Sequence, residues 1–287
     1  MDWDVVAHGY GLAEAPTIDV DGSLVFSDVL GGGVYRVDAA AKVTTVVPKR
    51  RGVGGIAIHE DGGIVCSGRD LVHVREGYES RTVLHVDGVA GWNDVCTDAA
   101  GRVYAGALRF AVFDPEAQVV PGELWRVALD GDATVVFGDV VHANGVACTA
   151  DGSTIYLSDS RRQRIIVFDV QRAIRREIDM SALGHPDGMA LDEHGAVWVA
   201  LVSGGIARLT PDGDIDRRLE PPSAFTTSLC FAGRDLYVTT GGHSGNTELR
   251  GCVLRTTVDV AGAPVAPARI STHANRQRGP TSRDPLS

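Results

Sequence analysis

The chain has 287 residues, of which 44% are apolar and 22% are charged, an ordinary composition for a globular protein. Its formal net charge of −10 argues against a nucleic-acid partner, because phosphate binding needs clustered lysine and arginine. No apolar run reaches the ~18–20 residues of a membrane span, and the acidic first residues lack a signal pattern, so we expect a cytoplasmic protein without membrane contact.

In chain order, the first element that recurs is a short apolar run, a turn with Asp and Gly, and a second apolar run. This pattern is typical of a β-hairpin. Six copies follow one another, at residues 15–28, 54–68, 93–106, 144–159, 187–200 and 228–240. Their turn glycines are 40, 39, 51, 43 and 38 residues apart; they are Gly22, Gly62, Gly101, Gly152, Gly195 and Gly233.

After most of these hairpins comes a third strand signal, and often a fourth. A period near 40 with about four strands per repeat predicts an all-β chain folded as a six-bladed propeller with antiparallel blades. Residues 3–8 are expected to add an outer strand to the last blade and close the ring. Residues 171–183 could form a short helix or an outer strand. We expect one domain over residues 1–270 and a disordered polar tail over residues 271–287.

Four polar residues share one position in the repeat. Glu14, Asn93, Asn144 and Asp187 each stand eight residues before a turn glycine. In blades arranged around an axis, side chains at one register position converge. Two carboxylates and two amides then form an oxygen-lined cage in the central channel, which suits a hard divalent cation. The alternative is that these residues only cap turns.

Two histidines and a basic cluster accompany these positions. His142 and His185 each stand two residues before a proposed ligand, where they could pack the loop, act as a general base or contact a substrate. The basic cluster at residues 161–164 is expected to be a solvated loop between strands.

Four segments resemble a known family, the senescence marker protein, gluconolactonase and luciferin-regenerating enzyme family, whose members include regucalcin. They are residues 13–38, 92–106, 142–160 and 185–200, with the motifs E-x-P, ND, NG and PDG-M in order. The resemblance runs from about residue 10 to 245. It implies a six-bladed propeller with one divalent metal in the channel, usually calcium, with zinc, manganese or magnesium as alternatives. It also implies hydrolysis of a lactone, or of organophosphates in some relatives.

Carried over by position, the resemblance gives roles to the four polar residues. Glu14, Asn144 and Asp187 would be the metal ligands, and Asp187 would also be the base that activates water. Asn93 would face the metal through a water or bind the substrate.

The sequence departs from this family beside Asn93. Relatives that act on sugar lactones carry an arginine two residues before this asparagine, where this chain has Gly91. Trp92 would offer a flat apolar wall, and Arg109 could replace the missing charge. Because sugar hydroxyls need polar partners, these departures predict a lactone or related cyclic ester less polar than a sugar lactone.

Two other functions stay open. One is a different metal-dependent reaction on a small molecule, such as phosphotriester hydrolysis with Asp187 attacking directly. The other is a non-catalytic propeller with a structural metal, in which Trp92, Phe110 and Phe225 would cover the channel mouth. The expected partner is a small-molecule substrate, and the sequence does not determine the oligomeric state.

Overall fold

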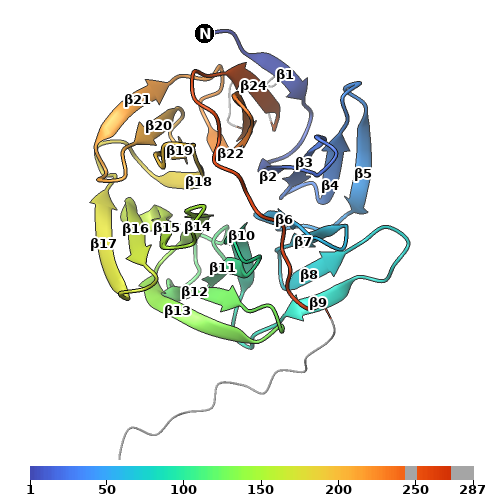
Figure 1. Cartoon of the computed structure of the whole chain (residues 1–287), viewed down its shortest axis with the longest axis vertical. Helices are drawn as coiled ribbons and strands as arrows, with labels where there is room; N and C mark the ends of the chain where they lie inside the picture. The colour runs from blue at the N-terminus through green and yellow to red at the C-terminus, as the bar shows by residue number, and fades with distance from the viewer. Residues whose placement is uncertain (243–250, 273–287) are drawn as a thin grey trace, which may run out of the picture.

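The computed structural model describes residues 1–242 and 251–272. Six blades surround one axis, and each is a four-stranded antiparallel sheet (Figure 1). The predicted six-bladed propeller is therefore confirmed. Within the described ranges the helical structure consists of the 3-10 turn Ser160–Arg162, and no helix there is long and apolar enough to cross a membrane.

The strands of a blade follow one another in chain order from the axis outward. Blade 1 contains β2 (Ala13–Ile18), β3 (Leu24–Asp28), β4 (Gly33–Val37) and β5 (Val43–Pro48). Blade 2 contains β6 (Ile56–Ile58), β7 (Ile64–Cys66), β8 (Leu71–Val74) and β9 (Arg81–Leu84). Blades 3 and 4 are β10 (Gly91–Thr97), β11 (Val103–Leu108), β12 (Gly122–Val127), β13 (Ala133–Val140), and β14 (Ala143–Cys148), β15 (Thr154–Asp159), β16 (Arg164–Asp169), β17 (Ile174–Asp179). Blade 5 is β18 (Pro186–Leu191), β19 (Val197–Leu201), β20 (Ile206–Leu209) and β21 (Ile215–Leu219).

Blade 6 closes the ring. It contains β22 (Thr226–Ala232), β23 (Asp235–Thr240) and β24 (Val253–Thr257), and its outer strand is β1 (Asp4–Ala7) from the start of the chain. The pairing of β1 with β24 joins the two ends of the propeller, as the sequence predicted, so that no blade lacks a neighbour. The region 171–183 resolves as the outer strand β17 rather than a helix.

Aspartate and glycine shape the hairpin turns between the first two strands of a blade. In blade 3, Oδ1 of Asp98 accepts the N–H groups of Ala100 and Arg102 at 3.0 and 3.1 Å. Gly101 in the same turn has a φ of 87°, which glycine adopts without steric cost. Asp192 caps the corresponding turn of blade 5 in the same way. These turns fix the hairpin lengths and so keep the register of the inner strands.

The hydrophobic core lies between neighbouring blades rather than in one central mass. Each of six clusters of buried side chains is shared by two adjacent sheets. In the cluster between blades 2 and 3, the rings of Trp92 and Trp125 meet edge to face with centroids 6.1 Å apart. The axis itself is left to polar side chains.

After blade 6 the chain crosses the axis. Residues 258–272 run over the end of the channel where the hairpin turns lie, the red segment in Figure 1. Main-chain hydrogen bonds join this segment to blades 5, 2 and 3: Ala263 N–H to Leu191 O, Ala268 N–H to Ile58 O, and Arg269 N–H to Gly101 O. Access to the axis is therefore left to the opposite face. Residues 273–287, most of the predicted tail, lie outside the described residues.

Strand β1 allows a matched test of ring closure. Ala7 is 5% exposed and packs between blades 6 and 1, whereas Val5 on the same strand is 48% exposed. We expect Ala7→Glu to lower the free energy of unfolding by about 2–4 kcal/mol, because it buries an unpaired charge. Val5→Glu should change it by less than about 0.5 kcal/mol. Urea unfolding measures both, and equal midpoints would contradict this packing of β1.

Candidate active site at the axis of the propeller

Each of the four polar residues at the shared position lies in a β-bulge near the start of an inner strand. The strand register shifts between Glu14 and Thr17, between Trp92 and Val95, between Ala143 and Val146, and between Pro186 and Met189. A bulge adds a residue to one strand and re-aims its side chain. The bulge is thus the local device that turns Glu14, Asn93, Asn144 and Asp187 away from the blade faces and toward the axis.

Blade 2 has a glycine at this position. A Cβ atom on Gly54 would lie 2.1 Å from Oδ1 of Asn93, far inside van der Waals contact. Gly54 therefore makes room for the amide of Asn93. Blade 2 therefore carries no polar side chain at this position because a side chain there would collide with Asn93.

Contacts between blades link three of the four residues. Nδ2 of Asn93 donates to Oδ1 of Asn144 at 3.0 Å and to the carbonyl oxygen of Ala143 at 3.0 Å. The side chain of Asn144 lies close enough to the carboxylate of Asp187 to lower its pKa, against the larger opposite effect of burial. The structure thus brings together residues that are up to 94 positions apart in the chain (187 − 93).

Asp94 is a fifth residue of the site, and the offset rule did not select it. Its Oδ2 accepts the N–H of Val146 at 3.0 Å and its Oδ1 accepts the N–H of Val95 at 2.7 Å. Blades 4 and 5 carry glycine at the same place, Gly145 and Gly188. The signal in the sequence was an acidic residue at a position where the next two blades carry glycine.

The carboxylates of Glu14 and Asp187 are buried, and Asp94, a half-buried residue, lies near both. Burial raises the pKa of Asp94 to about 7. Burial, followed by repulsion from Asp187 and Asp94, raises the pKa of Glu14 well above its usual value. Burial and the charge of Asp94 raise the pKa of Asp187 likewise. Within residues 1–242 and 251–272, no lysine or arginine forms an ion pair with these three groups.

One oxygen in the cluster has no hydrogen-bond partner. It is Oδ1 of Asp187, a buried atom near the start of β18. An orphaned buried acceptor normally costs free energy. Together with the excess negative charge and the all-oxygen donor set, it fits a site for a hard divalent cation.

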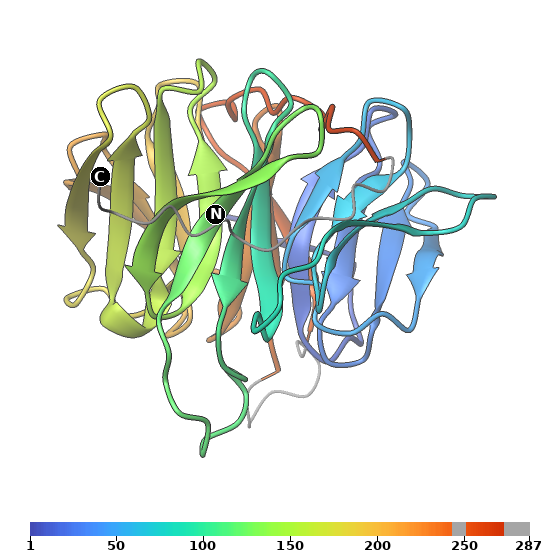
Figure 2. The same ribbon diagram turned by 90° about the horizontal axis from the view of Figure 1, so that it is seen from below.

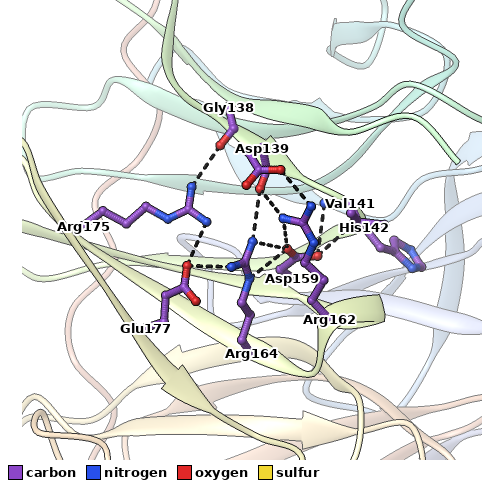
Figure 3. Close-up of polar contacts among 9 residues, drawn as sticks. All are labelled: Gly138, Asp139, Val141, His142, Asp159, Arg162, Arg164, Arg175 and Glu177. Atoms are coloured by element: carbon purple, nitrogen blue, oxygen red, sulfur yellow. Dashed lines mark hydrogen bonds and ion pairs between the residues drawn. The ribbon is translucent and has the colours of Figure 1, made fainter.

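Buried aspartates form hydrogen bonds with the loops that precede the proposed metal ligands. Oδ1 of Asp159, at the end of β15, accepts the N–H groups of Val141 and His142 at 3.2 and 3.1 Å (Figure 3). Its Oδ2 lies 2.9 Å from Nη2 of Arg164, which also contacts Glu177. This network fixes the main chain two residues before Asn144.

Blade 1 repeats this anchor. Asp28 ends β3 as Asp159 ends β15, and its carboxylate accepts the N–H groups of Gly11 and Leu12 at 2.9 and 3.1 Å. Blade 4 adds a second kind of support, because Oγ of Ser158 donates to the carbonyl oxygen of Asp187 at 2.8 Å. Metal-site chemistry depends on such outer contacts as well as on the ligands.

The two histidines lie at the rim of the site. Burial, with Arg161 next in importance, lowers the pKa of His142 to about 4, so its ring is neutral at neutral pH. Nδ1 of His185 lies 2.9 Å from the carbonyl oxygen of Ser160. A nitrogen that donates to a carbonyl leaves Nε2 as the acceptor. The main chain of His142 and the ring of His185 thus have structural contacts, and a role of either side chain in substrate binding stays a prediction.

Two predicted substrate contacts are wrong in their geometry. The indole of Trp92 is 1% exposed and packs on Trp125 between blades 2 and 3, so it does not form a wall of the channel. The guanidinium of Arg109 forms a forked ion pair with Glu123 at 3.0–3.2 Å and donates to the carbonyl oxygen of Asp87. Its charge is neutralised within blade 3 and does not replace a missing substrate arginine.

The chain matches a described protein family and two curated relatives over most of its length. The family model described as SMP-30/Gluconolactonase/LRE-like region matches residues 12–242. The chain is 28% identical over 274 residues to 6-deoxy-6-sulfogluconolactonase of Pseudomonas putida, covering 88% of this chain and 92% of that protein. It is 29% identical over 250 residues to pentonolactonase XacC of Haloferax volcanii, covering 82% and 83%.

A solved structure shares the fold. The crystal structure described as a calcium-binding protein, regucalcin, from Agrobacterium tumefaciens superimposes with a TM-score of 0.78 at 21% identity. The superposition covers 92% of this chain and 96% of that one.

Proposed function

This chain belongs to the SMP-30/gluconolactonase/LRE-like family, and on that premise we propose that it hydrolyses a lactone at the axis, with one divalent cation as cofactor. The observation that carries the proposal is the buried, unpartnered Oδ1 of Asp187 among three carboxylates. Two relatives are named for lactones, 6-deoxy-6-sulfogluconolactone and pentonolactones, which favours this reaction over phosphotriester hydrolysis.

Glu14, Asn144 and Asp187 would hold the cation through oxygen atoms. Calcium is the first choice because the donor set contains carboxylates and an amide, and one solved structure of this fold is described as calcium-binding. When bound, such a cation polarises the lactone carbonyl and stabilises the negative charge that develops on its oxygen.

The residues of the chain perform the remaining steps. Asp187 accepts a proton at Oδ1 from the water that attacks the acyl carbon, as a carboxylate next to that water can do. The ring C–O bond breaks, and the proton passes to the leaving ring oxygen, so that lactone and water give a hydroxy acid. Asn93 keeps Asn144 oriented through Nδ2, which leaves its Oδ1 for the substrate or a water.

We also propose that the substrate has fewer hydroxyl groups than a sugar lactone. Trp92 no longer supports this idea, since it is buried in the core. Gly91 still does, because the position lacks the arginine of sugar-specific relatives and has space for it. A Cβ atom there would meet only the carbonyl oxygen of Gly68, at 3.5 Å.

The non-catalytic alternative required aromatic side chains over the channel mouth. Trp92 is buried between blades, and the ring of Phe110 lies under the guanidinium of Arg161. Phe225 precedes β22 and packs beside Gly241 of blade 6. Trp92 and Phe110 therefore do not form the cover that this alternative required.

The first prediction concerns the cation. The raised pKa values mean that the folded protein keeps protons that the unfolded chain has lost, so metal-free stability should fall as pH rises from about 4 to about 7. A cation binds the ionised carboxylates and should restore this stability. We expect one divalent ion per chain by elemental analysis. Saturating calcium should raise Tm by about 5–10 °C at pH 8 and by less at pH 5.

Calcium, zinc and manganese should be compared in the same assay. A metal content near zero, together with an unchanged Tm at pH 8 for all three ions, would contradict both the metal site and the proposed reaction.

The second prediction separates the two roles of Asp187. Asp187→Asn keeps an oxygen ligand but removes the proton acceptor, whereas Glu14→Gln removes one charge and spares the base. At saturating metal we expect Glu14→Gln to regain most of its kcat, and Asp187→Asn to stay about 10²–10⁴-fold below the parent protein. If added metal fully restores the kcat of Asp187→Asn, proton transfer belongs to another group, and His185 and His142 are the next candidates.

The third prediction concerns Gly91. Gly91→Arg should raise kcat/KM for a hydroxylated lactone relative to an unsubstituted lactone of the same ring size by about tenfold or more, since a hydrogen bond to a charged group contributes roughly 1.5–3 kcal/mol. Gly91→Met is the matched control, because it adds similar length without charge. If both variants keep the substrate ranking of the parent protein, Gly91 does not set the polarity of the substrate.

A further inference from the structure

The turn between β15 and β16, together with the first residue of β16, carries three arginines that differ in their partners. Arg162 contacts Asp139 at 2.8 Å and Asp159 at 3.6 Å, and Arg164 contacts Asp159 at 2.9 Å (Figure 3). Arg161 is exposed and forms no hydrogen bond or ion pair with any residue in the described ranges. The basic cluster therefore contains two structural arginines and one whose charge is not neutralised there.

Arg161 is nevertheless held in place. Its guanidinium lies over the ring of Phe110, with Cζ 4.9 Å from the ring centroid. Phe110 is 5% exposed and follows β11 of the neighbouring blade, so the stacking platform is rigid. Stacking uses the face of the guanidinium and leaves the N–H groups at its edge free. An arginine in this arrangement is prepared for a planar anion such as a carboxylate.

The turn is tied directly to the two strands that carry Asn144 and Asp187. The N–H of Ser160 donates to the carbonyl oxygen of His142 at 3.0 Å. The carbonyl oxygen of Ser160 lies 2.9 Å from Nδ1 of His185. Each histidine stands two residues before a proposed ligand, a span of at most about 7 Å along the chain.

Phe110 lies at the same end of the propeller. It begins the long loop 109–121 between β11 and β12, which projects from one face of the molecule (Figure 2). The register places this end beside the start of β10, where Asn93 lies, because Leu108 pairs with Gly91. Arg161 and Phe110 thus border the access to the axis, on the face opposite the C-terminal segment.

We propose that Arg161, supported by Phe110, binds an anionic substituent of the substrate, so that the protein acts on a lactone that carries a carboxylate. The proposal rests on the proposed function and names the substrate class of the same site. The absence of an arginine at position 91 agrees with this proposal. Such a lactone needs a cation near its charged end and few partners for hydroxyl groups.

Electrostatics explain why one arginine matters here. The chain has a formal charge of −10, and three carboxylates lie at the axis, so an anionic substrate is repelled on approach. A fixed guanidinium at the rim offsets this repulsion and orients the substrate with its charged end away from the reacting carbonyl.

The test compares two substrates that differ by one charge. They are a five-membered lactone with a ring carboxylate and the methyl ester of that carboxylate, with ring opening followed by NMR on the calcium-loaded protein. We expect Arg161→Met to lower kcat/KM for the acid by about 10–100-fold and to change it for the ester by less than about threefold. Arg161→Lys should lie between, because it keeps the charge but not the planar fork.

Arg172→Met is the control for the loss of one positive charge. Arg172 lies in the turn between β16 and β17, at the other end of the blade, and its side chain is 76% exposed. It should leave the ratio of acid to ester unchanged. An equal effect of Arg161→Met on both lactones, or none on either, would overturn the role of Arg161.

A binding experiment keeps this proposal separate from the proposed function. If the parent protein opens neither lactone, the hydrolase proposal fails, and calorimetry with the same two lactones then decides the role of Arg161. Binding of the acid in preference to the ester, lost in Arg161→Met, would support the anion site. Equal affinity for acid and ester, or binding that Arg161→Met leaves unchanged, would overturn it.

Discussion

Desolvation of the carboxylates of Glu14, Asp94 and Asp187 is the constraint on which the rest of the site depends. Burial is the main cause that raises their pKa values, repulsion adds to it at Glu14 and Asp187, and no lysine or arginine of the described residues forms an ion pair with them. Such an arrangement opposes folding and persists only if the surrounding structure holds it in place. The β-bulges and the main-chain N–H groups bonded to Asp94 do so. An unfavourable electrostatic arrangement that the surrounding fold holds in place is typical of functional sites.

The closed ring supplies the rigidity that this arrangement needs. The site residues come from blades 1, 3, 4 and 5, so the cage exists only when all blades are docked. Pairing of β1 with β24, the clusters between blades and the C-terminal segment across the axis each couple distant parts of the chain. The unfavourable electrostatic free energy at the axis is thereby offset by many contacts elsewhere in the fold.

In the proposed function, chemistry and specificity would occupy different parts of the molecule. The axis is built from inner strands, whose hairpins fix it in every blade, while the rim is built from loops such as 109–121 and the turn Ser160–Arg162. Loops tolerate change more readily than strands do. Relatives named for different lactones are consistent with this division, since a shared axis with different rims allows one reaction on several substrates.

The sequence by itself determined the period, the six blades and the convergence of Glu14, Asn93, Asn144 and Asp187, because hairpin length and turn chemistry are local properties that fix register. Tertiary structure alone decided which neighbours the other side chains meet. Trp92 was placed at the channel because it adjoins Asn93, yet the bulge sends the two side chains in different directions. Glu123 neutralises Arg109 across a strand pair, and Phe110 supports Arg161 across two blades. Such contacts depend on how sheets pack against one another, which no local pattern encodes.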